Sequence, residues 1–239
     1  EKNLPADYIP SLLESYPPEL IKAYLLGRFT NLTSGTVYHQ FDRKLNNCEE
    51  VEQPGEPIYI GMDFNVGKMA GIVHVLRLGL PCAVTEIINA YDTPDMIRII
   101  KERFWLYDGS DYKKVREIYI YPDASGDSRK SSNASSTDIA QLRQAGFHVI
   151  VNDSNPPVKD RINSMNAMFC NANGERRYKV NVKRCPIYTE SLEQQVWADN
   201  GEPDKKSNKD HPNDAGGYYI IKQFPIMKPA FDITLGTTF

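Results

Sequence analysis

The sequence predicts an α/β domain built on a mixed central sheet, with three antiparallel strands followed by two parallel strands. Apolar, β-rich runs at residues 58–64, 70–76 and 82–88 are separated by short turn signals, which favours an antiparallel meander. Two more such runs, at residues 115–121 and 147–151, alternate with helical patterns, which is typical of strands that pair in parallel. The helices are therefore expected to flank the sheet.

The predicted helices are recognised by apolar residues at helical spacing and by start and stop signals. They span residues 93–104, 137–146, 158–170, 188–197 and 213–224. After the third of them, Asn173-Gly174 followed by the alternating RYKVNVK predicts an added β-hairpin.

Residues 1–56 differ from this pattern because they are rich in Pro and turn residues. Short helices near residues 9–13 and 20–26 and a short strand within GTVYHQF are expected there. The predicted parts are an N-terminal linker segment at 1–56, the α/β domain at 57–229 and a C-terminal tail at 230–239.

Composition excludes several classes of protein. The 239 residues include 28 Lys and Arg against 31 Asp and Glu, a net charge of −3, so any nucleic-acid partner must be held by a local patch. No apolar run approaches the roughly 20 residues that span a bilayer, so no membrane partner is expected. Four cysteines without a C-x-x-C pair are too sparse for a disulfide scaffold or a thiolate zinc site.

Two aspartates directly follow predicted buried strands. Asp63 ends YIGMD, and Asp123 ends IYIYPD. Taken singly, each is an ordinary turn or cap residue, but at the ends of adjacent parallel strands both would lie at the sheet edge where α/β proteins bind ligands. Strands lie roughly 4.8 Å apart and paired catalytic metals about 3.5–4 Å apart, so the two carboxylates can flank a metal pair.

A third acid would complete an all-oxygen site. The best candidate is Asp214 in DHPNDAGGYY, near the start of the last predicted helix, where a first-turn acid on the helix dipole is an equally ordinary role. Three clustered carboxylates repel one another unless a divalent cation neutralises them, and oxygen ligands favour Mg²⁺ or Mn²⁺.

Other polar residues lie near these acids in the sequence. Asp127 and Asp210 can hold a metal ligand through water, although a loop or cap role is more ordinary for both. His211 lies three residues before Asp214, and we expect it to pack or to orient another group by a hydrogen bond, because no second His pairs with it at i+4.

The order of elements resembles the RNase H-like fold, and the motifs resemble the C-terminal nuclease domain of the large terminase subunit of tailed double-stranded DNA phages. GMDFNVGKMAGIVHV is similar to that family's first strand with its acid, and YPDASGDSRKSSNASSTDIAQLRQAGFHVI to its second acidic motif. VKDRINSMNAMFCNANGERRYKVNVKRCPIYTESLEQQVW resembles the helix, hairpin and helix that follow, and DHPNDAGGYYI the final motif. The likeness covers roughly residues 20–225, and the ordered set is more specific than any one motif.

This resemblance implies an endonuclease that cuts concatemeric phage DNA during packaging by two-metal hydrolysis with Mg²⁺ or Mn²⁺, with Asp63, Asp123 and Asp214 as catalytic metal ligands. It also implies double-stranded DNA, an ATPase motor domain, the portal and the small terminase subunit as partners. The location would be the cytoplasm of the infected bacterium and not the mature virion. No G-x-x-x-x-G-K-[ST] motif is present, so the motor domain is expected to be absent from this chain.

DNA binding needs positive charge near the acids, because phosphates dominate affinity. Three groups of basic residues follow the first acidic motif, and they either line a DNA groove or form an ordinary solvated surface. They are Arg129 and Lys130 in a Ser-rich loop, Arg176, Arg177, Lys179, Lys183 and Arg184 around the predicted hairpin, and Lys205, Lys206 and Lys209 before the last motif.

Three other interpretations stay open. An RNase H-like nuclease of the resolvase or transposase type would share the acids. An actin-like nucleotide-binding module also begins with an acid-bearing strand, but its phosphate loop needs Gly and Ser or Thr directly after the Asp, and FNVGK offers one Gly. A degenerate RNase H-like scaffold would only bind partners, and the presence of three separate acids argues against it.

Overall fold

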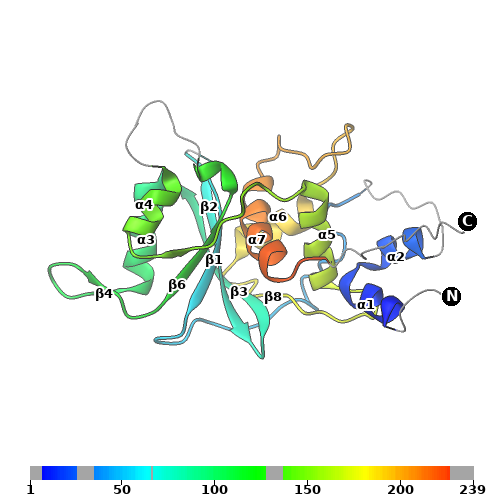
Figure 1. Ribbon diagram of the computed structural model, residues 1–239, viewed down its shortest axis with the longest axis horizontal. Coiled ribbons are helices and arrows are strands. Elements are labelled where there is room, and N and C mark those ends of the chain that lie inside the picture. The colour runs from blue at the N-terminus through cyan, green and yellow to red at the C-terminus, as the bar shows by residue number, and fades with distance from the viewer. Residues whose placement is uncertain (1–6, 26–34, 66, 128–136, 227–239) are drawn as a thin grey trace, which may run out of the picture.

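A computed structural model describes residues 7–25, 35–65, 67–127 and 137–226 (Figure 1). Its centre is a six-stranded sheet in the order β7-β6-β1-β2-β3-β8, with helices on both faces. The predicted mixed sheet, with three antiparallel strands followed by two parallel ones, is confirmed. The tail expected at 230–239 lies outside the described residues.

The central strands are buried on both faces, which explains their nearly continuous apolar sequence. The strands of the sheet are β1 (Ile58–Asp63), β2 (Met69–Arg77), β3 (Leu80–Ala90), β6 (Ile118–Pro122), β7 (His148–Val149) and β8 (Lys179–Val180). Leu78 and Gly79 both have positive φ, 53° and 78°, and form the tight turn between β2 and β3. Turns of this kind match the twist of antiparallel strands.

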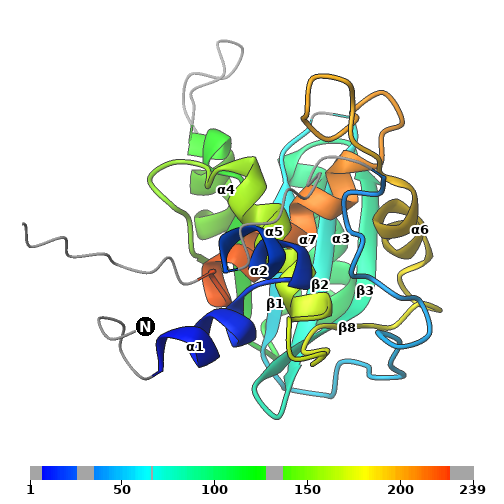
Figure 2. The same ribbon diagram turned by 90° about the vertical axis from the view of Figure 1, so that its right-hand side faces the viewer.

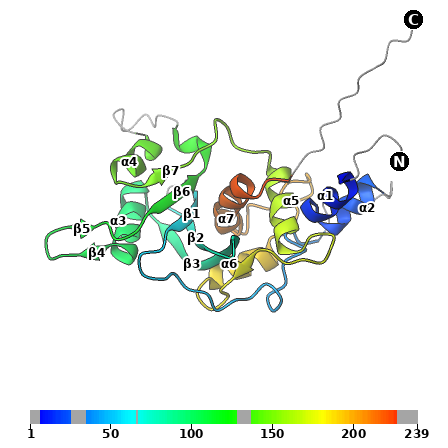
Figure 3. The same cartoon turned by 60° about the horizontal axis from the view of Figure 1, so that its bottom comes forward.

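The added hairpin lies elsewhere in the chain than predicted. After Asn173-Gly174 the chain does not fold back on itself, because β8 pairs in parallel with the start of β3 and extends the sheet. A short hairpin is instead formed by β4 (Leu106–Tyr107) and β5 (Tyr112–Lys113), which project beside α3 (Figure 3). The free edge of β3 was available as a partner, and the sequence pattern does not reveal that edge.

The five predicted helices are confirmed, with ends that differ by a few residues. They are α3 (Thr93–Phe104), α4 (Asp138–Gln144), α5 (Val158–Phe169), α6 (Pro186–Gln194) and α7 (Asp210–Gln223), and a turn of 3-10 helix, η1 (Ala124–Asp127), follows β6. Asp92 caps α3 by accepting a hydrogen bond from the Asp95 amide at 2.9 Å. Gly146, with φ 95°, follows the end of α4.

The helices form two layers, one on each face of the sheet (Figure 1). On one face α3 and α4 bury Met96, Ile100 and Leu142 against side chains of β1, β2 and β6. On the other face α5, α6 and α7 bury a second apolar core that includes Met165 and Leu192. Both faces of β1 are thereby removed from water, which fixes its position at the centre of the domain.

Helix α7 lies unusually close to β1. A Cβ atom built on Gly61 would lie 2.0 Å from the carbonyl oxygen of Ala215 in α7, so only glycine fits there. Gly216 and Gly217 similarly let Tyr188 and Arg161 approach the helix, because a Cβ at either position would lie within 3 Å of those side chains. Close packing therefore explains why two glycines lie inside this helix.

The N-terminal residues pack on the same domain. α1 (Tyr8–Ser15) and α2 (Pro18–Tyr24) match the two predicted helices, and α1 contacts α5 (Figure 2). The strand predicted within GTVYHQF is wrong, since this segment forms turns that bury Val37 and Tyr38 in the core. In the described parts of the chain, no helix has the length and apolar character needed to cross a membrane.

Candidate active site at the carboxyl edge of the sheet

Asp63 and Asp123 lie at the ends of adjacent parallel strands, as predicted. The register pairs Met62 of β1 with Pro122 of β6, so the next residue of each strand is an aspartate. The Asp123 amide donates a hydrogen bond to the Met62 carbonyl at 3.0 Å, which continues the pairing to the acids. Ligand sites of α/β sheets lie at this edge.

Helix α7 adds further acids to the same place. Its first two turns carry Asp210, His211 and Asp214, and the close approach of the helix to Gly61 brings these turns beside the end of β1. Asp63, Asp123, Asp210 and Asp214, hereafter the acid cluster, all line one cavity of about 680 Å³. The three predicted metal ligands therefore share one cavity.

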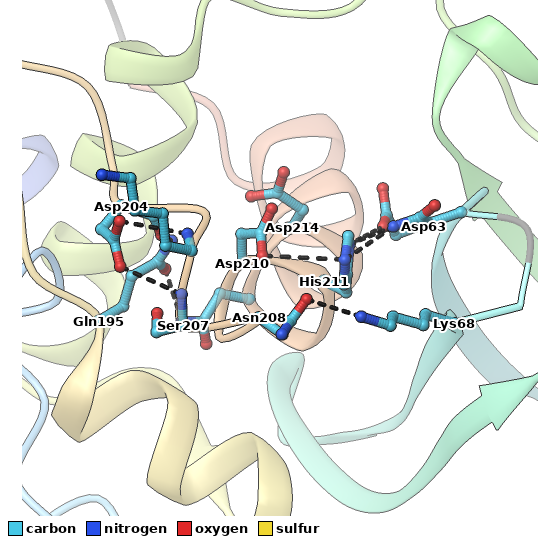
Figure 4. Close-up of polar contacts among 12 residues, drawn as sticks. Asp63, Lys68, Gln195, Asp204, Ser207, Asn208, Asp210, His211 and Asp214 are labelled. Atoms are coloured by element: carbon cyan, nitrogen blue, oxygen red, sulfur yellow. Dashed lines mark hydrogen bonds and ion pairs between the residues drawn. The ribbon is translucent and has the colours of Figure 1, made fainter. Parts of the chain in front are cut away.

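Asp63 is held by a histidine. Its Oδ2 lies 3.0 Å from Nδ1 of His211, and the side-chain nitrogen Nδ2 of Asn65 lies 2.7 Å from Nε2 of the same ring. A carboxylate only accepts, so Nδ1 carries the proton and donates a hydrogen bond to Asp63. His211 thus orients a carboxylate by a hydrogen bond, and Figure 4 shows it between Asp63 and Asp210.

Asp123 is held from the other side of the cavity. Its Oδ1 accepts hydrogen bonds from the Ser125 amide and from Nδ2 of Asn155, both at 2.6 Å. The Asn155 side chain also accepts from the Ala124 amide at 2.8 Å. Asn155, which the sequence analysis did not single out, therefore fixes both the strand end and the carboxylate.

Asp214 pairs with Arg161, a second residue that the sequence analysis missed. Nη2 of Arg161 donates to Oδ1 of Asp214 at 2.6 Å, and Arg161 is only 4% exposed. The Arg161 side chain lies along α7 where Gly217 leaves room for it. A glycine inside a predicted helix was the one sequence signal for such an approach.

Burial and mutual repulsion set the charge of these groups. Burial raises the pKa of Asp214 to about 6; Arg161 opposes the rise, and the charges of Asp63 and Asp210 add to it. The hydrogen bond to Asp63 raises the pKa of His211. The cavity therefore concentrates negative charge that the chain only partly neutralises.

The donor set suits a hard divalent cation. Carboxylate oxygens are the ligands that Mg²⁺ and Mn²⁺ prefer, and Oδ1 of Asp210 is buried without a hydrogen-bond partner among the described residues. Within the described ranges, however, no three His, Cys, Asp or Glu side chains are gathered tightly enough to hold one ion. Arg161 pairs with Asp214, and His211 pairs with Asp63.

The remaining predicted acid, Asp127, ends η1, and its side chain lies outside the described part of the structure. Arg129 and Lys130 likewise fall outside the described residues.

The predicted basic residues fall into two places. Lys205 and Lys206 are exposed and line the cavity, on a loop that also carries Glu202 and Asp204. Lys209, at the start of α7, donates to Glu190.

The basic residues at 176–184 do not reach the acid cluster. β8 pairs with residues 82 and 83 at the start of β3, which is the end of the sheet where β1 begins, whereas Asp63 is where β1 ends. Each of these side chains is also bonded within the chain. Arg176 donates to Asn46, Arg177 to the Glu14 carbonyl, Lys179 to the Leu45 carbonyl, Lys183 to Glu49 and Arg184 to Glu52.

The sheet order, the helices and the acids at the carboxyl edge define an RNase H-like domain. The family model of the terminase RNaseH-like domain matches residues 60–223, and the chain belongs to this family. No curated protein sequence matches the chain.

Solved structures with the same fold include large terminases. The large terminase of a thermophilic bacteriophage superimposes with a TM-score of 0.62 at 22% identity, over 92% of this chain and 53% of that one. The same protein in complex with ATP-gamma-S gives a TM-score of 0.63 at 21% identity, over 91% and 52%. The P22 large terminase nuclease domain gives 0.57 at 18% identity, over 82% and 97%. This chain thus spans about half the length of the thermophilic phage protein and nearly the whole length of the P22 nuclease domain.

Proposed function

We propose that this domain is a metal-dependent endonuclease that cuts double-stranded, concatemeric phage DNA during genome packaging. The observation that carries the proposal is the shared cavity of Asp63, Asp123 and Asp214, two of them at the ends of adjacent parallel strands. Two Mg²⁺ or Mn²⁺ ions held by these three residues would activate water and neutralise charge at the leaving oxygen.

The chain's own residues position the site. His211 donates to Asp63 and Asn155 donates to Asp123, so each carboxylate is oriented before substrate arrives. Lys205 and Lys206 offer exposed positive charge at the cavity, where a DNA phosphate would lie. Of the basic residues predicted to bind DNA, only these two line the cavity in the described part of the chain, and the proposed DNA path therefore runs over their loop.

The remainder of the packaging machinery lies outside this domain. The thermophilic phage relative is about twice as long and is described with ATP-gamma-S bound. We accordingly place an ATPase motor domain in the full-length protein, with the portal and the small terminase subunit as its partners.

Plasmid nicking tests the proposal. With Mn²⁺, the domain should convert supercoiled plasmid to nicked and linear forms, and EDTA should abolish cutting. Asp63→Asn, Asp123→Asn and Asp214→Asn should each lower the rate by roughly 100-fold or more, because each removes a charge worth several kcal/mol in the transition state.

Asp111→Asn is the matched control, since Asp111 is an exposed acid on the β4–β5 hairpin. This variant should cut at the wild-type rate. Cutting that persists in EDTA, or in all three site variants, would refute the proposed mechanism.

A further inference from the structure

Arg161 is the single buried cation among the lysines and arginines that line the described cavity. Lys205 and Lys206 line it too, but both are exposed, whereas Arg161 is 4% exposed. Charged side chains are almost never buried to this extent unless they are paired. Its burial therefore calls for a reason.

The side chain of Arg161 is fixed along its whole length. Its Cγ and Cδ atoms lie against Gly217, where a Cβ would come within 2.8 Å of both. Its guanidinium carbon lies 4.6 Å from the centre of the Tyr218 ring, which favours a cation over its face. At the tip, Nη2 meets Asp214 at 2.6 Å. Three successive contacts thus aim one guanidinium at one carboxylate.

The environment of that carboxylate is otherwise negative. Asp63 and Asp210 line the same cavity and are 7% and 5% exposed. Two buried polar atoms here have no hydrogen-bond partner among the described residues, namely Oδ1 of Asp210 and Nε of Arg161. Buried groups of this kind are costly to the fold, and they mark a site that the chain does not complete by itself.

We propose that Arg161 is a positioning residue that holds Asp214 in the cavity and serves as the counter-charge of the acid cluster while no divalent cation is bound. This inference rests on the proposed function, because it assumes that the acid cluster binds such a cation. Arg161 and the cation are then alternative sources of the same positive charge. By linkage, removing Arg161 makes the fold depend more strongly on the cation.

Thermal unfolding of the whole chain, in EDTA and in saturating MnCl₂, tests the idea. Wild type should gain stability from Mn²⁺, since a ligand that binds only the folded state raises Tm. Arg161→Met keeps the apolar stem and removes the charge, and it should lower Tm in EDTA by roughly 6 °C or more. In Mn²⁺ at least half of that deficit should disappear, and calorimetry should show tighter Mn²⁺ binding than in wild type.

Arg43→Met is the matched control. Arg43 also pairs with one carboxylate, Glu193, but at the surface, so its Tm should stay within about 1 °C of wild type in both conditions. If Arg161→Met does not fold, Arg161→Lys replaces it, because lysine keeps the charge but loses the planar fork. Arg161→Lys should also lower Tm in EDTA and recover part of that loss in Mn²⁺, but both changes should be smaller.

The possible failures are distinguishable. If Arg161→Met lowers Tm equally in EDTA and in Mn²⁺, or does not lower it, the proposed role of Arg161 is wrong. In that case a rise of the wild-type Tm with Mn²⁺ would still support the metal site. A wild type that does not respond to Mn²⁺ would overturn the metal site, and with it this inference.

Discussion

Helix α7 touches two buried polar clusters that are built in opposite ways. The acid cluster lines a shared cavity, and one of its carboxylate oxygens, Oδ1 of Asp210, is buried without a hydrogen-bond partner among the described residues. The second cluster, hereafter the histidine cluster, consists of His74, Tyr178 and Tyr188, all 0% exposed. Its three side chains are neutral, and each is hydrogen-bonded.

The hydrogen bonds of the histidine cluster run in one direction. Nδ1 of His74 lies 3.1 Å from the Tyr59 carbonyl, which only accepts, so the proton is on Nδ1. Nε2 then accepts from Tyr178 at 2.7 Å, and Tyr178 lies 3.0 Å from the hydroxyl of Tyr188. Burial lowers the pKa of His74 to about 3, so the ring is neutral at neutral pH.

The two clusters differ in whether they stabilise the fold or serve a ligand. A fully bonded neutral cluster contributes to the fold, whereas clustered buried carboxylates oppose folding and are kept where a ligand needs them. The two clusters should therefore respond in opposite ways to pH and to substitution.

Both clusters depend on the contact between α7 and β1, so breaking it should have the largest effect. In Gly61→Ala the new Cβ would meet a backbone carbonyl at 2.0 Å, which cannot move aside as a side chain can. We expect a loss of roughly 3 kcal/mol or more in urea unfolding.

Gly71→Ala in β2 is the control for that substitution. Its nearest neighbours would be side-chain atoms at 3.4 Å or more, which is ordinary contact. A similar loss for both variants would mean that the close approach of α7 is not what Gly61 serves.

The histidine cluster should make the fold sensitive to acid. The folded-state pKa of His74 is depressed, so only the unfolded chain takes up its proton as the pH falls below about 6.5. The stability difference between wild type and His74→Gln should then shrink by roughly 1.4 kcal/mol per pH unit between about pH 6 and 4. Urea unfolding at several pH values measures it, and a difference that does not vary with pH would show that His74 titrates normally.

The acid cluster should act with the opposite sign. The pKa of Asp214 is raised to about 6, so between about pH 4 and 6 the folded protein keeps a proton on Asp214 that the unfolded chain loses. The folded state is therefore most stable, as far as Asp214 is concerned, below about pH 4, and it loses stability as the pH rises to 6. In EDTA at about pH 7, Asp214→Asn should relieve roughly 1–2 kcal/mol of this cost relative to wild type at the same pH, and less at about pH 4. A benefit that is larger in acid than at neutral pH would contradict the raised pKa.

The smallest expected effect is on DNA binding, where substitutions at the two ends of the sheet should differ. In an Asp63→Asn background, which prevents cutting, Lys206→Ala should reduce the slope of log affinity against log salt by about 0.9. Lys183→Ala, at the opposite end and paired with Glu49, should leave the slope unchanged. Equal effects would place DNA contacts at both ends.

Much of the fold follows from local sequence patterns. The central strands and the five helices of the domain carry apolar periodicity that matches the structure, and polar side chains cap the starts of α3 and α4. β8 and the turns that bury Val37 do not, because both are decided by which edge or core surface remains uncovered after the other elements pack. Partners distant in sequence leave no local signal.

The candidate site divides in the same way. Asp63 and Asp123 stand out because an acid at the end of a buried strand is poorly placed for packing, and Asp214 stands out only as the third acid that would complete their site. Asn155 and Arg161 lie within ordinary polar sequence, and only their hydrogen bonds to Asp123 and Asp214 reveal a role. The basic residues at 176–184 illustrate the converse. In the sequence they are candidates for DNA binding, but in the structure their side chains bond to other parts of the chain, far from the cavity.

The most direct test of the proposed metal site is the anomalous scattering of Mn²⁺ soaked into crystals of this domain. We predict peaks in the cavity that are bound by oxygens of Asp63, Asp123 and Asp214, with Arg161 displaced from Asp214 or sharing it. Saturated crystals without a peak between these three side chains, or with Mn²⁺ bound only elsewhere, would contradict the site.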